Sequence, residues 1–279
     1  LDQPLLDFFP KYADPAKPER ARITLRHALT MSTGQQWDEN IPYTDPRNDE
    51  IMMTRSQDPT GYVLTRPSVA EPGKLWEYNG GTTHVLGKIV QQTTGEPLAE
   101  YARRRLFTPL GITDFDWRGD LDGIPATASG LRLRPRDLAK FGSLYLHRGQ
   151  WNGRQVLPAE WVRDSTARHI LLPTSVSAFG TTAYGYQWWN TCLRTARGIM
   201  EMPTAVGNGQ QRIYVLRDLD MVVTILAGRY NDPTASGLPQ RLLLEQIIPA
   251  VTRERGATRQ PPAPKWHRTT CDAAAMAAR

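Results

Sequence analysis

The chain has 279 residues, of which 40% are hydrophobic and 22% are charged, and its net charge is +6. This composition is typical of a globular protein that buries a sizeable core, and the longest apolar run, residues 221–228, is too short to cross a bilayer. The arginines are scattered, and the one tight cluster, residues 103–105, is expected on a solvated helix face. We therefore expect no membrane span and no nucleic acid partner.

The first 72 residues are rich in proline. Residues 1–22 contain four prolines, which exclude a long helix and predict a short extended or turn segment followed by a polar loop. Thr24 is a suitable N-cap for a short helix over residues 25–31, which ends before Gly34. Residues 35–72 carry five more prolines and no sustained periodicity, so we expect a long packed loop whose aromatic residues wall a binding cleft.

The stretch around Tyr78 combines an aromatic run, a glycine pair and a helix. The run ends at Tyr78, two glycines follow Asn79, and a helical pattern then extends over residues 81–93 to Gly95. Tyr78 is thus expected on a tight turn before a helix, where Gly80 allows a positive φ or the close approach of another group. A tyrosine hydroxyl held there can transfer protons if a neighbour lowers its pKa. The alternative is a core aromatic beside an ordinary glycine turn.

The rest of the chain mixes helical and strand-like patterns. Helices are predicted over residues 97–107, from residue 136 onward, and over residues 158–166 and 237–251. Strand-like runs are predicted over residues 184–190, 210–216 and 221–227. The pair Asn152-Gly153 is the signal of a hairpin turn. Residues 253–279 are rich in Arg, Pro and Ala, which predicts a largely disordered tail.

The order of these elements predicts the fold class. Helices come first, a strand meander follows, and a helix closes the pattern, which indicates an α+β fold with an antiparallel sheet flanked by helices. No change in composition divides the sequence, so we expect one domain over residues 1–252.

Six stretches together resemble one family. They are residues 1–6 (Leu-Asp-Gln-Pro-Leu-Leu), 23–34, 76–81 (Trp-Glu-Tyr-Asn-Gly-Gly), 128–131 with 135–142, 184–189 and 207–210 (Gly-Asn-Gly-Gln). In this order they resemble the β-lactamase-related serine hydrolases, which include class C β-lactamases, DD-peptidases, EstB-type esterases and 6-aminohexanoate-dimer hydrolases. The resemblance covers residues 1 to 250 and implies the β-lactamase/transpeptidase-like form of the α+β fold.

This resemblance implies a reaction through an acyl-enzyme. A serine attacks a carbonyl carbon, and water then opens the acyl-enzyme. A lysine one helical turn later, in the motif Ser-x-x-Lys, activates the serine. By the same resemblance, the tyrosine motif relays the proton, the residues after it border the substrate, and the third motif supplies an oxyanion donor. The corresponding residues are Tyr78 for the relay, Asn79 and Gly80 for the substrate, Gly207, Asn208 and Gly209 for the third-motif edge, and Gln210, through its N–H, for the oxyanion.

The sequence departs from the family pattern at its motifs. It contains no Ser-x-x-Lys, so we expect a fragment that lacks the first strands and the nucleophile helix, with a natural pseudoenzyme as the alternative. Gly80 stands where β-lactamases carry the asparagine that contacts the substrate, and the third motif lacks their Lys or His. Both changes favour a small-molecule ester or a linear amide over a carboxylate-bearing β-lactam as the substrate.

Other hydrolase types lack their motifs. The sequence has no Gly-x-Ser-x-Gly and no HExxH, and Cys192 and Cys271 form no CxxC pair, so we expect neither a metal nor another cofactor. His84 is expected to pack or to lie at the surface rather than to act as a base. Two hypotheses remain, a serine hydrolase domain without its nucleophile and a non-catalytic ligand-binding module on the same fold. The sequence leaves the compartment open and is compatible with a periplasmic or secreted location.

Overall fold

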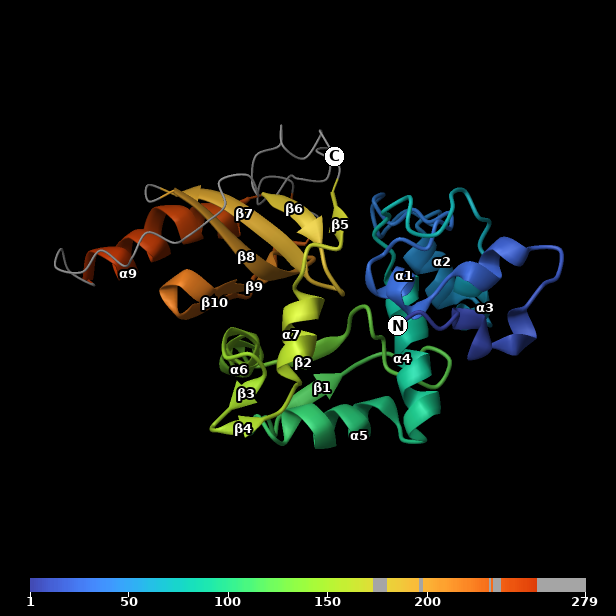
Figure 1. The fold of residues 1–279 in the computed structure, drawn as a ribbon, viewed down its shortest axis with the longest axis horizontal. Coiled ribbons are helices and arrows are strands. Elements are labelled where there is room, and N and C mark those ends of the chain that lie inside the picture. The colour runs from blue at the N-terminus through green and yellow to red at the C-terminus, as the bar shows by residue number, and fades with distance from the viewer. Residues whose placement is uncertain (173–179, 196–197, 231, 233–236, 255–279) are drawn as a thin grey trace. The chain divides into compact units, whose positions relative to one another are not determined.

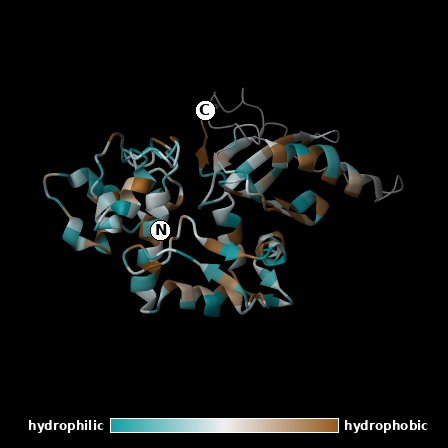
Figure 2. Cartoon of the chain, turned by 180° about the vertical axis from the view of Figure 1, so that it is seen from behind, coloured by the Kyte–Doolittle hydropathy of each residue, from teal (hydrophilic) through white to brown (hydrophobic). Residues whose placement is uncertain are grey.

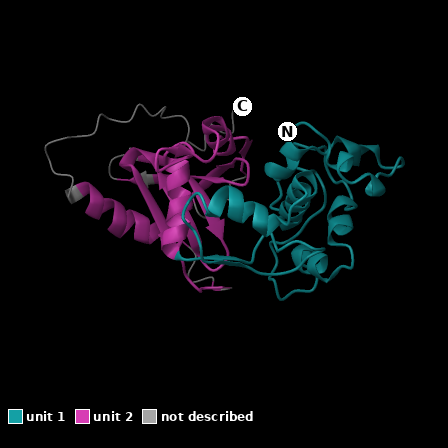
Figure 3. Ribbon diagram, turned by 90° about the horizontal axis from the view of Figure 1, so that it is seen from below, with its two compact units in different colours: residues 1–134 teal, residues 135–279 magenta. Residues whose placement is uncertain are grey.

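The computed structural model describes residues 1–172, 180–195, 198–230, 232 and 237–254, shown as a ribbon in Figure 1. The chain divides into two compact units, Leu1–Arg134 and Pro135–Arg279, which Figure 3 colours separately. The single domain expected over residues 1–252 stays a prediction. The expected tail lies, beyond Glu254, outside the described residues.

Unit 1, every residue of which is described, consists of short helices and one small sheet. The strands β1 (Phe115–Trp117) and β2 (Leu131–Leu133) pair antiparallel. The helices are η1 (Leu5–Asp7), η2 (Pro10–Tyr12), η3 (Pro18–Arg22), α1 (Leu25–Leu29), α2 (Asp49–Arg55), α3 (Pro59–Leu64), α4 (Gly80–Thr94), α5 (Leu98–Ala102) and η4 (Arg103–Phe107). The helices predicted after Thr24, after Tyr78 and over residues 97–107 are confirmed.

Residues 35–72 are more regular than the sequence predicts. Helices α2 and α3 lie within this range, and the side chains of Asn48 and Asp58 cap their first turns. The helices have seven and six residues, which is too short for a helical period to stand out from the surrounding prolines. The prediction of a continuous loop was therefore wrong, and the two cap residues were the available signal.

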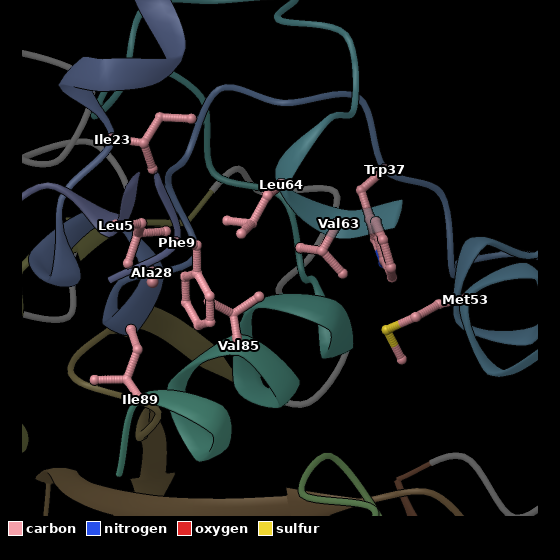
Figure 4. Packing of buried hydrophobic residues seen from close by; sticks show 10 residues of the cluster. All are labelled: Leu5, Phe9, Ile23, Ala28, Trp37, Met53, Val63, Leu64, Val85 and Ile89. Carbon is pink, nitrogen blue, oxygen red and sulfur yellow. The ribbon is translucent and has the colours of Figure 1, made fainter. Parts of the chain in front are cut away.

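The core of unit 1 lies around α4, its longest helix. Val85 and Ile89 are four residues apart and therefore share one face of α4. Both belong to a buried cluster with Phe9, Trp37 and Met53, seen in Figure 4. The loop aromatic Trp37 is thus a core residue, and the packing of α4 against it determines where the first turn of the helix lies.

The described part of unit 2 is built on a six-stranded antiparallel sheet. Its strands follow one another in chain order, so that each pairs with the next. They are β5 (Ile170–Leu171), β6 (Thr181–Tyr184), β7 (Trp189–Thr195), β8 (Gly198–Gly207), β9 (Gln211–Leu216) and β10 (Met221–Ile225). The predicted meander is confirmed and is wider than the three runs that indicated it.

The aromatic run over residues 184–190 forms a hairpin rather than one strand. Tyr184 ends β6, Trp189 begins β7, and the N–H of Gly185 donates to the carbonyl oxygen of Trp188 at 2.7 Å across the turn. Aromatic residues favour strands on both sides of this turn, and no Asn-Gly pair marks the turn itself. The prediction of one strand there was therefore wrong.

Alternate residues of β9 face opposite sides of the sheet. Ile213 and Val215 pack in one cluster with Tyr145 of helix α6 (Pro135–Leu146). Tyr214 and Leu216 pack in another cluster with Leu243 of the C-terminal helical segment, residues 238–254. Helices therefore cover both faces of the sheet, which confirms the predicted α+β fold.

The remaining elements of unit 2 are a hairpin and further helices. They are β3 (Gln150–Trp151), β4 (Arg154–Gln155), α7 (Ala159–Ser165), η6 (Arg217–Leu219), α8 (Leu238–Leu242), η8 (Leu243–Ile247) and α9 (Ile248–Glu254). Asn152 and Gly153 have φ angles of 49° and 77° and form the predicted turn between β3 and β4. The helices carry both polar and apolar residues (Figure 2), and in the described ranges none has the length and apolar character needed to span a bilayer.

Leu242 and Leu243 allow a matched test of how the C-terminal helical segment packs on the sheet. Leu243 is 0% exposed, whereas its neighbour Leu242 is 41% exposed. We expect Leu243→Ala to lower the free energy of unfolding by about 2–5 kcal/mol, because a cavity replaces a buried side chain. Leu242→Ala should change it by about 0.5 kcal/mol or less. Urea denaturation of both variants measures the difference, and equal losses would contradict this packing.

Candidate active site

Tyr78 lies in an extended segment that is held against the end of α1. The N–H of Glu77 donates to the carbonyl oxygen of Met31 at 3.0 Å, and the N–H of Asn79 donates to the Met31 sulfur at 3.2 Å. Met31 is buried and has a φ of 54°, an uncommon value for a residue with a side chain. The backbone of Tyr78 is thus fixed on both sides by one buried methionine.

Asn79 is the N-cap of α4. Its side-chain oxygen accepts the N–H of Thr82 at 3.0 Å, and the Thr82 hydroxyl donates to the Asn79 carbonyl oxygen at 2.7 Å. Asn79 is only 2% exposed. These two bonds stabilise the first turn of the helix. The substrate contact expected of Asn79 stays a prediction, and a substrate would have to compete with the cap.

The glycines after Asn79 allow close approach rather than a positive φ. Neither Gly80 nor Gly81 has a positive φ, since both lie in the first turn of α4. A Cβ on Gly81 would lie 2.6 Å from the Trp37 ring, and a Cβ on Gly80 would lie 3.1 Å from Oε2 of Glu39. The sequence allowed both roles for the glycines, and the structure selects the second.

Glu39 is a buried carboxylate at the start of α4 that sequence reasoning missed. Its Oε2 accepts the N–H of Gly80 at 2.7 Å and the indole N–H of Trp37 at 2.7 Å. Burial raises the pKa of Glu39 to about 7, and the charge of the neighbouring Glu50 adds to this effect. In the sequence, only the spacing Trp37-x-Glu39 could indicate this residue. The spacing predicts nothing by itself, because only the fold brings Gly80 beside Glu39.

The Tyr78 hydroxyl lies in acidic surroundings. Burial, followed by the charges of Glu39 and Glu50, raises the pKa of Tyr78 above its ordinary value. A proton relay requires the opposite influence, because a tyrosine gives up its proton readily only when a nearby cation lowers its pKa. Tyr78 is therefore in its protonated form at neutral pH, and its relay role stays a prediction.

The predicted third motif is the turn between β8 and β9. Gly207 ends β8, and Asn208, Gly209 and Gln210 connect it to Gln211 at the start of β9. Gly209 and Gln210 have φ angles of 78° and 74°. The side-chain oxygen of Asn208 accepts the N–H of Gly209 at 2.7 Å, which tightens the turn. The oxyanion role of the Gln210 N–H stays a prediction.

Arg212 holds this turn from within the sheet. It is 2% exposed, and its guanidinium donates to the carbonyl oxygen of Gly207 at 3.1 Å and to the side-chain oxygen of Gln210 at 3.2 Å. Burial lowers the pKa of the guanidinium. The third motif lacks the Lys or His of β-lactamases, but the guanidinium cation of Arg212 is bonded to two residues of this motif. Sequence reasoning missed Arg212 because it stands outside the motif.

The structure describes the predicted site residues in two groups. Tyr78, Asn79 and Gly80 lie within three consecutive positions of unit 1, and residues 207–210 lie within one turn of unit 2. That the two groups form one site stays a prediction. Across the described ranges, no group of three His, Cys, Asp or Glu side chains is placed to bind a metal ion.

His84 is buried in α4 rather than exposed. It is 1% exposed, and its Nε2 lies 3.1 Å from the hydroxyl oxygen of Thr60. Burial lowers the pKa of His84 to about 4, so the ring is neutral at pH 7. Of the two placements expected for His84, packing and surface, the structure has the first.

A glycine substitution tests the close packing at the start of α4. We expect Gly81→Ala to lower the free energy of unfolding by about 1–3 kcal/mol, because its Cβ would overlap the Trp37 ring. Gly228→Ala is the control, since a Cβ at Gly228 meets nothing within 4 Å. Thermal and urea unfolding of both variants measure the change. An unchanged or raised stability of Gly81→Ala would contradict the packing described here.

Comparison with a solved structure supports the fold. The chain is similar to a candidate 6-aminohexanoate-dimer hydrolase from Bacillus anthracis, with a TM-score of 0.72 and 19% sequence identity, over 93% of this chain and 68% of that chain. At this identity the likeness concerns the fold alone. It agrees with the predicted sheet flanked by helices.

Curated relatives match parts of the chain. A lovastatin esterase from Penicillium rubens is 33% identical over 132 residues, which cover 44% of this chain and 29% of that protein. A 6-aminohexanoate-dimer hydrolase from Paenarthrobacter ureafaciens is 27% identical over 231 residues, which cover 75% of this chain and 56% of that protein. The chain thus spans only part of the length of these relatives. The profile of the Beta-lactamase family matches residues 1–246. As the order of its motifs predicted, this chain belongs to the beta-lactamase family of serine hydrolases and related proteins.

Proposed function

We propose that the chain is part of a serine hydrolase or acyltransferase that works through an acyl-enzyme on an ester or a linear amide. The names of the relatives, a lovastatin esterase and a 6-aminohexanoate-dimer hydrolase, support this substrate class. Residues 1–279 contain no Ser-x-x-Lys, and we assign the nucleophile and its lysine to a segment outside these residues. The chain contributes the tyrosine relay and the third motif.

The position of Tyr78 is the observation that carries this proposal. The tyrosine directly precedes a helix that is capped by Asn79, and hydrogen bonds to Met31 fix the backbone on both sides of it. A hydroxyl held in this way can be aligned with a serine and a leaving group without further ordering.

In the proposed reaction the serine oxygen bonds to the substrate carbonyl carbon. The serine proton passes to the lysine–tyrosine pair, and the ammonium form of the lysine lowers the pKa of Tyr78 against the raising effect of its acidic surroundings. Tyr78 then gives a proton to the leaving alkoxide or amine as the C–O or C–N bond breaks. The N–H of Gln210 stabilises the oxyanion, and water or an acceptor alcohol opens the acyl-enzyme.

The second candidate function is a non-catalytic ligand-binding module. The missing Ser-x-x-Lys favours it. The coding sequence directly upstream of Leu1 discriminates the two functions. Ser-x-x-Lys there supports the hydrolase, whereas an open reading frame without it supports the binding module.

A fluorophosphonate probe followed by intact-mass analysis tests where the nucleophile lies. We expect no adduct on residues 1–279, because no serine in this sequence has a lysine three residues later. The protein that includes an upstream Ser-x-x-Lys should gain one adduct per chain. An adduct on residues 1–279 would show that an internal serine is activated and would overturn the proposal.

Substitution of Tyr78 tests the relay in the upstream-extended protein. We expect Tyr78→Phe to lower kcat for a p-nitrophenyl ester by about 10²–10⁴-fold, the usual effect of losing a general acid or base. The KM should change little. Tyr101→Phe, in α5, is the matched control and should keep its rate. A kcat of Tyr78→Phe within twofold of the unaltered protein would exclude the relay.

A further inference from the structure

The carboxylate of Glu39 joins two distant segments at the start of α4. Its Oε2 accepts both the N–H of Gly80, 41 residues further along the chain, and the indole N–H of Trp37. Trp37 belongs to the core cluster of unit 1, and Gly80 is two residues after Tyr78. Glu39 therefore connects the core directly to the turn that carries the proposed relay.

The hydrogen bonds of Glu39 favour the charged form of its carboxyl group, whereas its burial opposes the charged form. The first N–H groups of a helix have no partner within the helix, and the helix dipole favours a negative charge there. Glu39 satisfies one of these groups, as Asn79 satisfies another through Thr82. However, Glu39 is only 6% exposed, and burial of a carboxylate is costly.

A glutamine could accept the same two hydrogen bonds at Oε1 without a buried charge. What the carboxyl group adds is therefore a proton that it gains or loses near neutral pH, and the loss of this proton leaves a buried charge. Gly80 leaves room for this contact, since a Cβ there would lie 3.1 Å from Oε2 of Glu39 and 3.5 Å from the Glu50 carboxyl carbon. Two carboxyl groups thus approach the same turn.

The segments around Glu39 carry both acidic and basic side chains. They are Asp49, Glu50 and Arg55 of α2, Asp38, Tyr43, Glu77 and Tyr78 in the segments before α2 and α4, and His84 and Lys88 of α4. Glu50 and Glu77 repel the ionised Glu39, and His84 is neutral at pH 7. Asp49 is paired with Arg66 at 3.1 Å. Burial first, and then Glu50 and Glu77, raise the pKa of Glu39 to about 7 against the lowering effect of its two hydrogen bonds.

We propose that Glu39 is the positioning residue of Tyr78: its carboxyl group holds the turn from Tyr78 to Gly80 against Trp37, and the loss of its proton weakens this hold. The effect on catalysis rests on the proposed function of Tyr78, whereas the effect on the turn does not. The sign follows from the pKa of Glu39, which burial raises from its ordinary value to about 7 in the closed turn. The closed turn therefore binds the proton more tightly than an opened one, so the turn is held below pH 7 and loosens as the pH rises through 7.

Nuclear magnetic resonance of residues 1–279 tests the proposal without any activity. The probes are the Trp37 indole N–H and the backbone N–H groups of Tyr78 and Gly80. We expect all three signals to shift together with a midpoint near pH 7. In Glu39→Gln this transition should vanish. In Glu50→Gln, the matched control, it should remain with a lower midpoint, because one repelling charge is gone.

Two results would overturn the proposal in this experiment. One is the absence of a transition between pH 5 and pH 9 in the three signals. The other is a transition that persists in Glu39→Gln or that leaves the Tyr78 signal unmoved. A folded Glu39→Gln protein, verified by unchanged signals from unit 2, keeps these results interpretable.

The kinetic arm uses the upstream-extended protein. Above pH 7 we expect Glu39→Gln to raise kcat by about 10- to 100-fold over the unaltered protein, since the glutamine holds the turn without a charge and small misplacements of a catalytic group have effects of this order. The KM should stay the same, and the limb of the kcat profile near pH 7 should disappear. A normal kcat profile together with a normal serine adduct would overturn the role of Glu39 and keep the proposed function. The absence of an adduct would count against the proposed function alone.

Discussion

The contact of Glu39 with Gly80 and Trp37 is the constraint on which the surroundings of Tyr78 depend. A buried carboxylate is stable only if hydrogen bonds and a favourable potential offset its desolvation, and the N-terminus of α4 supplies both. The same contact needs space, which Gly80 and Gly81 provide. The glycine pair, the aromatic core residue and the position of Tyr78 are therefore consequences of one close approach between a loop and a helix end.

Unit 2 has a comparable arrangement with the opposite charge. Arg212 lies on β9 opposite Val206 of β8, and its guanidinium bonds to Gly207 and Gln210 in the turn that follows. The turn contains a non-glycine residue, Gln210, with a φ of 74°, a conformation that persists only where neighbouring contacts hold it. In both units a buried ionic side chain bonds to the loop that carries a family motif. The two kinds of motif thus share one physical means of support.

Elements with a strong local signal agreed with the sequence. Helix α4 has a cap at Asn79, a regular apolar face and a terminating glycine with a φ of 67°. The hairpin at Asn152 follows from the conformations that its turn residues prefer. Elements without such signals were missed. Helices α2 and α3 are shorter than two periods, and the turn after Tyr184 has aromatic residues that favour strands on both sides.

The sequence by itself determined the family and the α+β fold class, because these depend on local propensity and on the order of short patterns along the chain. It also indicated that Gly80 admits a close neighbour. Only the tertiary structure decided that this neighbour is Glu39 and that Arg212 supports the turn after Gly207. Which charged side chain is buried depends on the residues that pack around it. A contact between residues 41 positions apart produces no periodic pattern in the sequence.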